Sequence, residues 1–146
     1  MCIRDRRKLE EASHLYEQAL SLDPDSPETH NNVALLRRQQ GRIEEADAHF
    51  RQALRLAPGS ALANFNYGRL LAAHRKYSAA EGYFRKGVAL DPRPAAAHNA
   101  LGACLAAQGR LEEAVALFHA ALERDPNFQR ARMNLQVAQD MLRQRR

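Results

Sequence analysis

The sequence contains no tryptophan and only two cysteines, and these absences set aside several classes of protein. Cys2 and Cys104 lie far apart and neither belongs to a CxxC pair, so we expect no disulfide framework and no zinc site. No apolar run approaches the ~18 residues that a membrane-spanning helix needs, so membrane insertion of this segment is not expected. The chain also lacks a glycine-rich phosphate loop and a nucleophile elbow. We therefore expect no enzymatic activity and no cofactor.

The net charge of +5 does not describe the body of the chain. The excess of arginine falls in residues 4–7 and 143–146, and from residue 8 to residue 142 basic and acidic side chains are equal in number. A nucleic-acid-binding protein needs its Lys and Arg side chains gathered on the folded surface. The sequence therefore argues against a nucleic-acid partner.

What the chain does contain is an internal repeat of 34 residues. Its prolines mark the period, at Pro24, Pro58, Pro92 and Pro126. Other positions keep the same spacing, and the residues that share a place in each copy are Ala12, Ala46, Ala80 and Ala114; Tyr16, Phe50, Phe84 and Phe118; Ala19, Ala53, Gly87 and Ala121; and Leu20, Leu54, Val88 and Leu122. Five columns in register over four copies predict four copies of one structural unit.

Each unit is predicted to contain two helices. Proline lacks an N–H group and disfavours the α conformation at the preceding residue, so each repeat proline ends a helix. Apolar residues upstream recur at three- and four-residue spacing, as in Ile43, Ala46 and Phe50, which indicates one amphipathic helix. Another lies between each proline and a turn near Gly41, Arg75 or Gly109. The sequence therefore predicts an all-α fold of helical hairpins.

Small residues and aromatic residues at fixed places predict how the helices pack. Ala34, Gly68 and Gly102 are expected to let the two helices of a pair approach closely. The aromatic rings of Phe50, Phe84 and Phe118 are expected to fill the space where one pair stacks on the next. Because no single pair can bury its own apolar faces, stability should come from stacked neighbours.

With these columns the sequence resembles the tetratricopeptide repeat (TPR) family, over essentially all of residues 7–143. The family's usual tryptophan position holds His30, Asn64 and His98, and one turn glycine is replaced by Arg75. The resemblance implies a right-handed α-solenoid of helix–turn–helix units with a C-terminal capping helix. It also implies that the first helices line a concave groove that binds a peptide.

We expect one solenoid domain over residues 7–143, with a half repeat at 7–26, full repeats at 27–60, 61–94 and 95–128, and a capping helix at 129–143. Residues 144–146 form a basic tail. Residues 1–6 read MCIRDR, which is what ATGTGTATAAGAGACAG, the end sequence of transposase-based library preparation, encodes from its ATG. We interpret these six residues as an adapter artefact and the chain as an N-terminally truncated fragment of a bacterial metagenomic gene.

The last helix has the pattern of an end cap. Ala131, Leu135, Ala138 and Leu142 are predicted to share one apolar face. Gln136 stands where earlier repeats place Ala34, Gly68 and Gly102 against a following helix. A polar residue at this place suits a helix that no further helix covers.

The family's groove positions hold residues of mixed character in this chain. Those that we select as the peptide-binding set are Asn31, Asn32, Leu35, Arg38, Leu62, Phe65, Asn66, Arg69, Asn99, Ala103, Arg130 and Asn134. An asparagine amide offers a donor and an acceptor together, which matches a peptide backbone of any sequence. The alternative is that asparagine is simply common at these positions across the family. A clamp for a terminal carboxylate is not expected, because only Asn66 of its residue types is in place.

Other polar residues have structural explanations. The six histidines do not pair with Cys, Asp or Glu in a metal-binding arrangement, so no metal site is expected. Glu10–Glu11, Glu44–Glu45 and Glu112–Glu113 recur at one phase, in the predicted first turn of each second helix, where the helix dipole favours negative charge. Cys104 occupies an apolar position and is expected to be a packed thiol rather than a nucleophile.

The sequence thus predicts a scaffold that binds a peptide or partner segment in a concave groove. The alternative is that the chain is the C-terminal TPR segment of a larger enzyme or of a secretion or assembly component that recruits its substrate or partner. We expect a soluble, cytoplasmic protein whose partner is a protein or peptide, and no small-molecule ligand. The identity of the partner does not follow from the fold.

Overall fold

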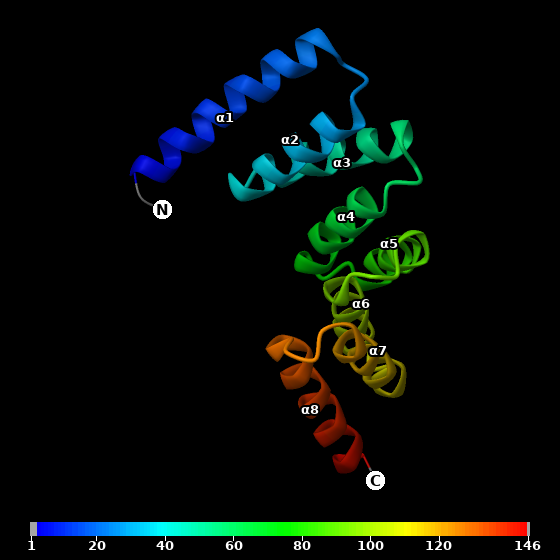
Figure 1. Cartoon of the computed structure of the whole chain (residues 1–146). Coiled ribbons are helices and arrows are strands. Elements are labelled where there is room, and N and C mark those ends of the chain that lie inside the picture. The colour runs from blue at the N-terminus through cyan, green and yellow to red at the C-terminus, as the bar shows by residue number, and fades with distance from the viewer. Residues whose placement is uncertain (1–2, 146) are drawn as a thin grey trace. The chain divides into compact units, whose positions relative to one another are not determined.

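The computed structural model describes residues 3–145, and within this range it contains eight helices and no strand (Figure 1). The all-α prediction is confirmed. In chain order the helices are α1 (Ile3–Leu22), α2 (Pro27–Gln39), α3 (Ile43–Leu56), α4 (Ala61–Ala73), α5 (Tyr77–Leu90), α6 (Ala95–Ala107), α7 (Leu111–Arg124) and α8 (Gln129–Gln144). Cys2, at one end of the predicted leader, and Arg146, at the end of the predicted tail, lie outside the described residues.

The chain divides into two compact units, Met1–Asn66 and Tyr67–Arg146, with the boundary inside α4. In the first unit α2 packs against α3, and α1 packs against α2. In the second unit α6 packs against both α5 and α7, and α7 packs against α8 (Figure 1). No helix in residues 3–145 is both long enough and apolar enough to cross a membrane.

The repeat prolines end helices as predicted. Helices α3, α5 and α7 stop at Leu56, Leu90 and Arg124, each two residues before a proline. Where an aspartate precedes the proline, its carboxylate accepts a hydrogen bond from the backbone N–H two residues on, at 3.1 Å for Asp91 and 3.0 Å for Asp125. These short turns reverse the chain into the next first helix.

The turns inside each hairpin share one backbone conformation. Gly41 and Gly109 have φ values of 77° and 81°, and Arg75 occupies the same place with a φ of 60°. The residue after each of them donates its N–H to a carbonyl five residues earlier, as Lys76 does to Leu71 at 2.9 Å. This left-handed residue closes the preceding helix and favours glycine, which has no Cβ to clash.

Arg75→Gly is therefore expected to stabilise the protein. The substitution removes the left-handed strain of a non-glycine residue and should raise the free energy of unfolding by about 1 kcal/mol. Urea denaturation followed by circular dichroism measures the change. Gly109→Ala is the matched control, since it places a side chain at a φ of 81° and should destabilise by a similar amount. Arg75→Gly having no effect or lowering stability would contradict the strain argument.

The predicted core residues are buried. Phe50, Phe84 and Phe118 expose 0%, 2% and 1% of their surfaces, and the alanine columns beside them are buried as well. The predicted close approach of paired helices is confirmed at Gly68 and Gly102, where a β-carbon would lie 2.8 Å from the ring of Phe84 or Phe118, respectively. Each of these two rings therefore packs against the small residue of its own pair, a contact that the sequence analysis did not place.

Helix α1 differs from the prediction at its start. It begins at Ile3 and so extends into the predicted leader. Glu10 and Glu11 consequently lie well inside the helix, and the first-turn explanation is wrong for this pair, although it holds for Glu44–Glu45 and Glu112–Glu113. No residue of α1 is fully buried.

Helix α8 buries the face that the sequence indicated. Ala131 and Ala138 are buried and Leu135 and Leu142 are half-buried, whereas Gln136 is exposed. Gln136 donates from Nε2 to Asp140 Oδ1 at 3.0 Å, one turn further along the helix. The polar residue at this place thus finds its partner on the surface of its own helix.

Candidate functional site

The residues of the predicted groove lie on the first helices of the pairs, and their exposure divides them into three groups. Asn31, Asn66 and Asn99 are buried. Half-buried are Leu35, Arg38, Phe65 and Asn134, and exposed are Asn32, Leu62, Arg69, Ala103 and Arg130. Only the second and third groups can contact a partner without a change in packing.

The buried asparagines are joined to asparagines of the following first helix. Asn66 donates from Nδ2 to Asn31 Oδ1 at 3.1 Å, and in the second unit Asn134 donates from Nδ2 to Asn99 Oδ1 at 3.0 Å. Each bond joins residues 35 positions apart. Because these amides bind one another, the accessible amide among the predicted groove residues of the first unit is that of Asn32, which accepts from Asn31 Nδ2 at 3.4 Å.

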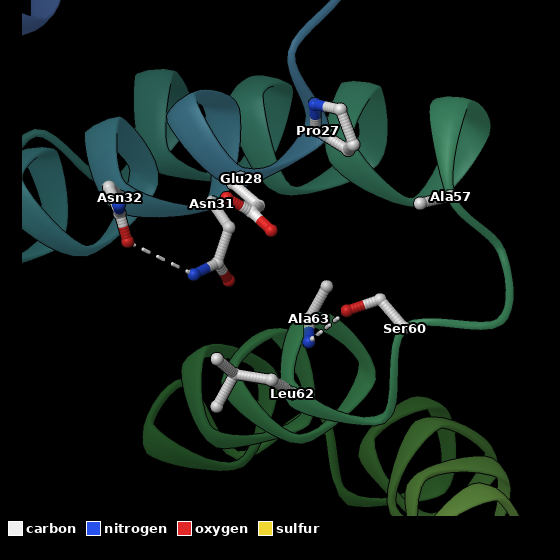
Figure 2. A pocket seen from close by; sticks show the side chains of 8 residues that line it. All are labelled: Pro27, Glu28, Asn31, Asn32, Ala57, Ser60, Leu62 and Ala63. Carbon is white, nitrogen blue, oxygen red and sulfur yellow. Dashed lines mark hydrogen bonds between the residues drawn. The ribbon is translucent and has the colours of Figure 1, made fainter.

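A cavity of about 490 Å³ lies beside Asn32 in the first unit. Its lining residues come from the first turns of α2, from the loop after α3 and from the start of α4, and they are Pro27, Glu28, Asn31, Asn32, Ala57, Ser60, Leu62 and Ala63. Figure 2 shows the side chains of Glu28 and Asn31 pointing from α2 toward the first turn of α4. Leu35, Arg38 and Phe65 do not line this cavity.

Local sequence fixes the two helix starts that frame the cavity. Ser26 caps α2 by accepting from Thr29 N at 3.2 Å, with Pro27 in the first turn. Ser60 does the same for α4, since its Oγ accepts from Ala63 N at 3.1 Å. Beside these caps the cavity combines the apolar side chain of Leu62, the amide of Asn32 and the carboxylate of Glu28, its one charged lining residue.

The position that holds tryptophan in the family has a recurring role that the sequence analysis missed. At this position one side chain of each copy contacts the carbonyl oxygen of the proline six residues before it. The four residues, spaced by 34, are His30, Asn64, His98 and Arg132. The distances are 2.8, 3.3, 2.8 and 2.7 Å in that order. Each side chain is a hydrogen-bond donor, and the constant offset from the proline was the available signal. These bonds hold the loop against the first helix and belong to the scaffold.

His30 also contacts His49 of α3, and this pair is the second feature that the sequence did not show. The two Nδ1 atoms lie 2.9 Å apart. A carbonyl oxygen can only accept, so His30 donates from Nε2 to Pro24 O, and the neutral His30 ring then accepts at Nδ1 from Nδ1–H of His49. Burial, then the neighbouring His30 and Arg37, lower the pKa of His49, and Glu45 opposes them.

This pair is expected to make stability depend on pH. His49 takes up a proton less readily when folded than when unfolded, so its contribution is present above the unfolded pKa of about 6.5 and is lost as the pH falls. We expect the free energy of unfolding to decrease from neutral pH to about pH 5 more steeply in the wild type than in His49→Gln. Urea denaturation across this range measures the two slopes.

His14→Gln is the matched control, because His14 is exposed on α1, where it contacts Gln18. Its slope should equal that of the wild type. Equal slopes for the wild type and His49→Gln would show that His49 titrates alike in the folded and unfolded chain, contrary to its half-buried position beside His30.

A buried arginine links three helices of the first unit. Arg37 of α2 donates to Ser13 Oγ at 2.7 Å and to Glu17 Oε1 at 2.8 Å on α1, and its Nε lies 3.3 Å from Glu45 Oε2 on α3. The hydrogen bond from Arg37 lowers the pKa of Glu17. A buried guanidinium requires such partners, so this cluster positions α1 rather than forming a binding site.

Metal-ligating side chains do not gather in either unit among its described residues. Residues 3–145 contain no group of three or more His, Cys, Asp or Glu side chains placed to hold a metal ion. Cys104 is buried, its Sγ donates to Tyr77 O at 3.1 Å, and burial raises the pKa of its thiol. A thiol held in this state is a poor nucleophile.

Comparison with known proteins places the chain. No curated protein matches the sequence significantly. Among solved structures, Pseudomonas aeruginosa PilF superposes with a TM-score of 0.88 at 22% identity, over 96% of this chain and 64% of that one. MamA superposes with a TM-score of 0.84 at 22% identity, over 96% and 84%. YrrB, described as a TPR protein with an unusual peptide-binding site, gives 0.80 at 26% identity, over 97% and 73%.

The family model of the tetratricopeptide repeat matches this sequence three times, over residues 4–61, 34–93 and 65–128. The matches overlap and together extend through seven of the helices, from α1 to α7. The helical hairpins, the proline-terminated second helices and these matches agree, and the chain belongs to the tetratricopeptide repeat family.

Proposed function

We propose that this chain is a protein-interaction scaffold, and that the cavity between the first turns of α2 and α4 binds an extended segment of a partner protein. The observation that carries the proposal is the combination of side chains at this cavity. Leu62 exposes 62% of its surface beside the accessible amide of Asn32 and the carboxylate of Glu28. An apolar contact next to a donor–acceptor pair suits a peptide in which side chains and backbone are both accessible.

Two relatives support a peptide as the partner. YrrB has a peptide-binding site according to its description, and the first TPR domain of Spaghetti (RPAP3) was solved bound to an HSP90 peptide, SRMEEVD. In the present chain the acidic Glu28 favours a segment with a basic side chain over an acidic peptide of that kind. No step of catalysis is assigned to the cavity.

The test is selection of short random peptides displayed on phage, followed by binding measurements on the selected peptides. We expect peptides that bind the wild type and lose most of their affinity for Asn32→Ala/Leu62→Ser. Both side chains are exposed, so the double variant should fold normally, which circular dichroism checks.

Leu22→Ser/Glu44→Ala is the matched control. It removes an apolar side chain that is more exposed than Leu62 and a polar one, both outside the cavity, and it should bind the selected peptides as the wild type does. Peptides that bind all three proteins equally would place the binding surface elsewhere. If no peptide that binds either unit can be selected from the library, the scaffold proposal itself is contradicted.

A further inference from the structure

Helix α8 carries a line of large apolar side chains that the second unit leaves uncovered. Met133, Val137 and Met141 expose 69%, 58% and 42% of their surfaces. They stand four residues apart and therefore share one face over two turns, a length of about 12 Å. We call these three residues the α8 stripe. A contiguous apolar face exposed to water indicates a site of interaction.

A cavity of about 150 Å³ opens beside the α8 stripe. It lies among α6, α7 and α8 and is lined by Ala103, Ala106, Leu111, Phe118, Asn134, Val137, Ala138 and Met141. Leu111 and Phe118 are almost fully buried and belong to the core, while the small alanines of α6 leave the space open. A cavity of this volume and apolar lining can accept a benzene ring, and so a branched aliphatic side chain as well.

The polarity of this lining favours a helical partner over an extended one. An extended peptide exposes backbone N–H and C=O groups that lose water on binding and need new partners. Asn134 is the one lining residue with a polar side chain, and its Nδ2 already donates to Asn99 Oδ1 at 3.0 Å. A helix satisfies its own backbone groups and presents only side chains to the groove.

The charges around the cavity favour one sign of charge on the partner. Helix α6 has no charged residue between Ala95 and Ala107. Helix α8 carries Arg130 near its start, three and seven residues before Met133 and Val137 and so on the same face. Arg145 stands directly after the helix, where it donates from Nη1 to Gly109 O at 3.2 Å. By the same spacing Arg132 and Arg143 fall on another face of α8, and Arg132 donates to Pro126 O. The one acidic residue of α8, Asp140, accepts from Gln136 and lies 3.5 Å from Arg143. Arginines therefore stand at both ends of an uncharged groove, and an acidic partner is complementary to them.

The same charges argue against a second copy of this chain as the occupant. Antiparallel pairing of two α8 stripes would place Arg130 of one copy beside Arg145 of the other. Juxtaposed like charges oppose association, whereas an acidic helix would neutralise them.

We infer that the α8 stripe and its cavity bind an acidic amphipathic helix of a partner protein, with one aliphatic side chain inserted between α6 and α8. The inference rests on the proposed scaffold function, and assigns the second unit a partner that differs from the extended segment proposed for the α2–α4 cavity. Methionine at two of the three stripe positions suits such contact, because its flexible side chain adapts to the surface that it meets.

Three synthetic peptides test the inference against the full chain. The first forms a helix with leucine at every fourth position along one face and glutamate on the other faces. The second replaces each glutamate by lysine, and the third has the composition of the first in an order that separates the leucines. By fluorescence anisotropy at low salt, the acidic helix should bind about ten-fold more tightly than the lysine helix, and salt should reduce the difference. The reordered peptide should bind as weakly as the lysine helix.

Val137→Asp should weaken binding of the acidic helix about ten-fold, since it places a like charge and a polar group in the apolar contact. Leu90→Asp is the matched control, as Leu90 is a large exposed apolar residue of α5 outside the cavity, and it should bind like the wild type. Equal binding of the acidic and lysine helices, or an unchanged affinity in Val137→Asp, would overturn the inference.

Three further outcomes bear on this inference, and two of them separate it from the proposed function. If none of the three peptides binds while phage-selected peptides still bind the α2–α4 cavity, the α8 inference is wrong and the scaffold function stands. If sedimentation shows a dimer that Val137→Asp dissociates, the occupant is a second copy, and the acidic-helix assignment is overturned. If the acidic helix binds but no peptide is selected at the α2–α4 cavity, the α8 inference stands and the assignment of the α2–α4 cavity is wrong.

Discussion

Phe118→Ala should lower the free energy of unfolding by about 3–5 kcal/mol, the largest effect that we expect from a single substitution in this chain. The ring is 1% exposed and lies against Gly102 of its own helix pair. It also lines the cavity beside α8, so its removal opens the contact between α7 and its neighbours on both sides. In a repeat protein each helix pair is stabilised by its immediate neighbours. The truncation should therefore weaken the packing of α7 against both α6 and α8.

Urea denaturation gives the overall change, and amide hydrogen exchange locates it. Exchange should accelerate throughout α6, α7 and α8. Leu90→Ala serves as the control, because this leucine of α5 exposes 44% of its surface and its truncation should change stability by less than about 0.5 kcal/mol. A loss below about 1 kcal/mol in Phe118→Ala would mean that the ring does not hold these helices together.

The repeated features of this fold were predictable from the sequence. The helix ends could be predicted from the prolines, because a proline disfavours the helical conformation at the residue before it. Burial of Phe50, Phe84 and Phe118 follows from their spacing, because each copy places the same residue type at the same point of the helical face. A signal that recurs in several copies in this way is visible without coordinates.

Features that occur in one copy only were not predictable. Arg37 stands where the next repeats have Leu71 and Leu105, both buried. Nothing in the repeat pattern indicates that a buried arginine would bind Glu17 and Ser13 of α1. The contact between His30 and His49 likewise depends on how α2 and α3 lie against each other, which periodicity within each helix does not determine.

The candidate site was predictable in part. Asn32 and Leu62 were selected from the sequence and line the cavity between α2 and α4. Glu28, its one charged lining residue, was not among the residues selected from the sequence. The mutual bonding of Asn31 with Asn66 could not be foreseen, because it requires the distance between successive first helices. It removes from the surface two amides that the sequence offered to a ligand.

Gly102→Ala should destabilise the protein although alanine is the better helix former. In an exposed helix the exchange would gain about 1 kcal/mol. Here the new Cβ would lie 2.8 Å from Phe118 Cε1 and 3.2 Å from Leu117 Cβ. Overpacking of this kind costs about 1–3 kcal/mol, so we expect a net loss of about 1 kcal/mol and a larger loss for Gly102→Val.

Gly82→Ala is the matched control for the expected loss of stability, because here the same exchange should stabilise the protein. Gly82 lies in α5 and no atom lies within 4 Å of its added Cβ, so the exchange should stabilise by about 0.5–1 kcal/mol. Alanine at 102 should become tolerable once the ring is smaller, and Gly102→Ala should cost less in a Phe118→Leu background than in the wild type. Stabilisation by Gly102→Ala equal to that of Gly82→Ala would contradict the close approach of α6 and α7.

The repeat at 27–60 shows why the destabilisation by Gly102→Ala should stay modest, since it buries Ala34 at the position of Gly102 with Phe50 at the position of Phe118. Alanine at this place is therefore compatible with the fold.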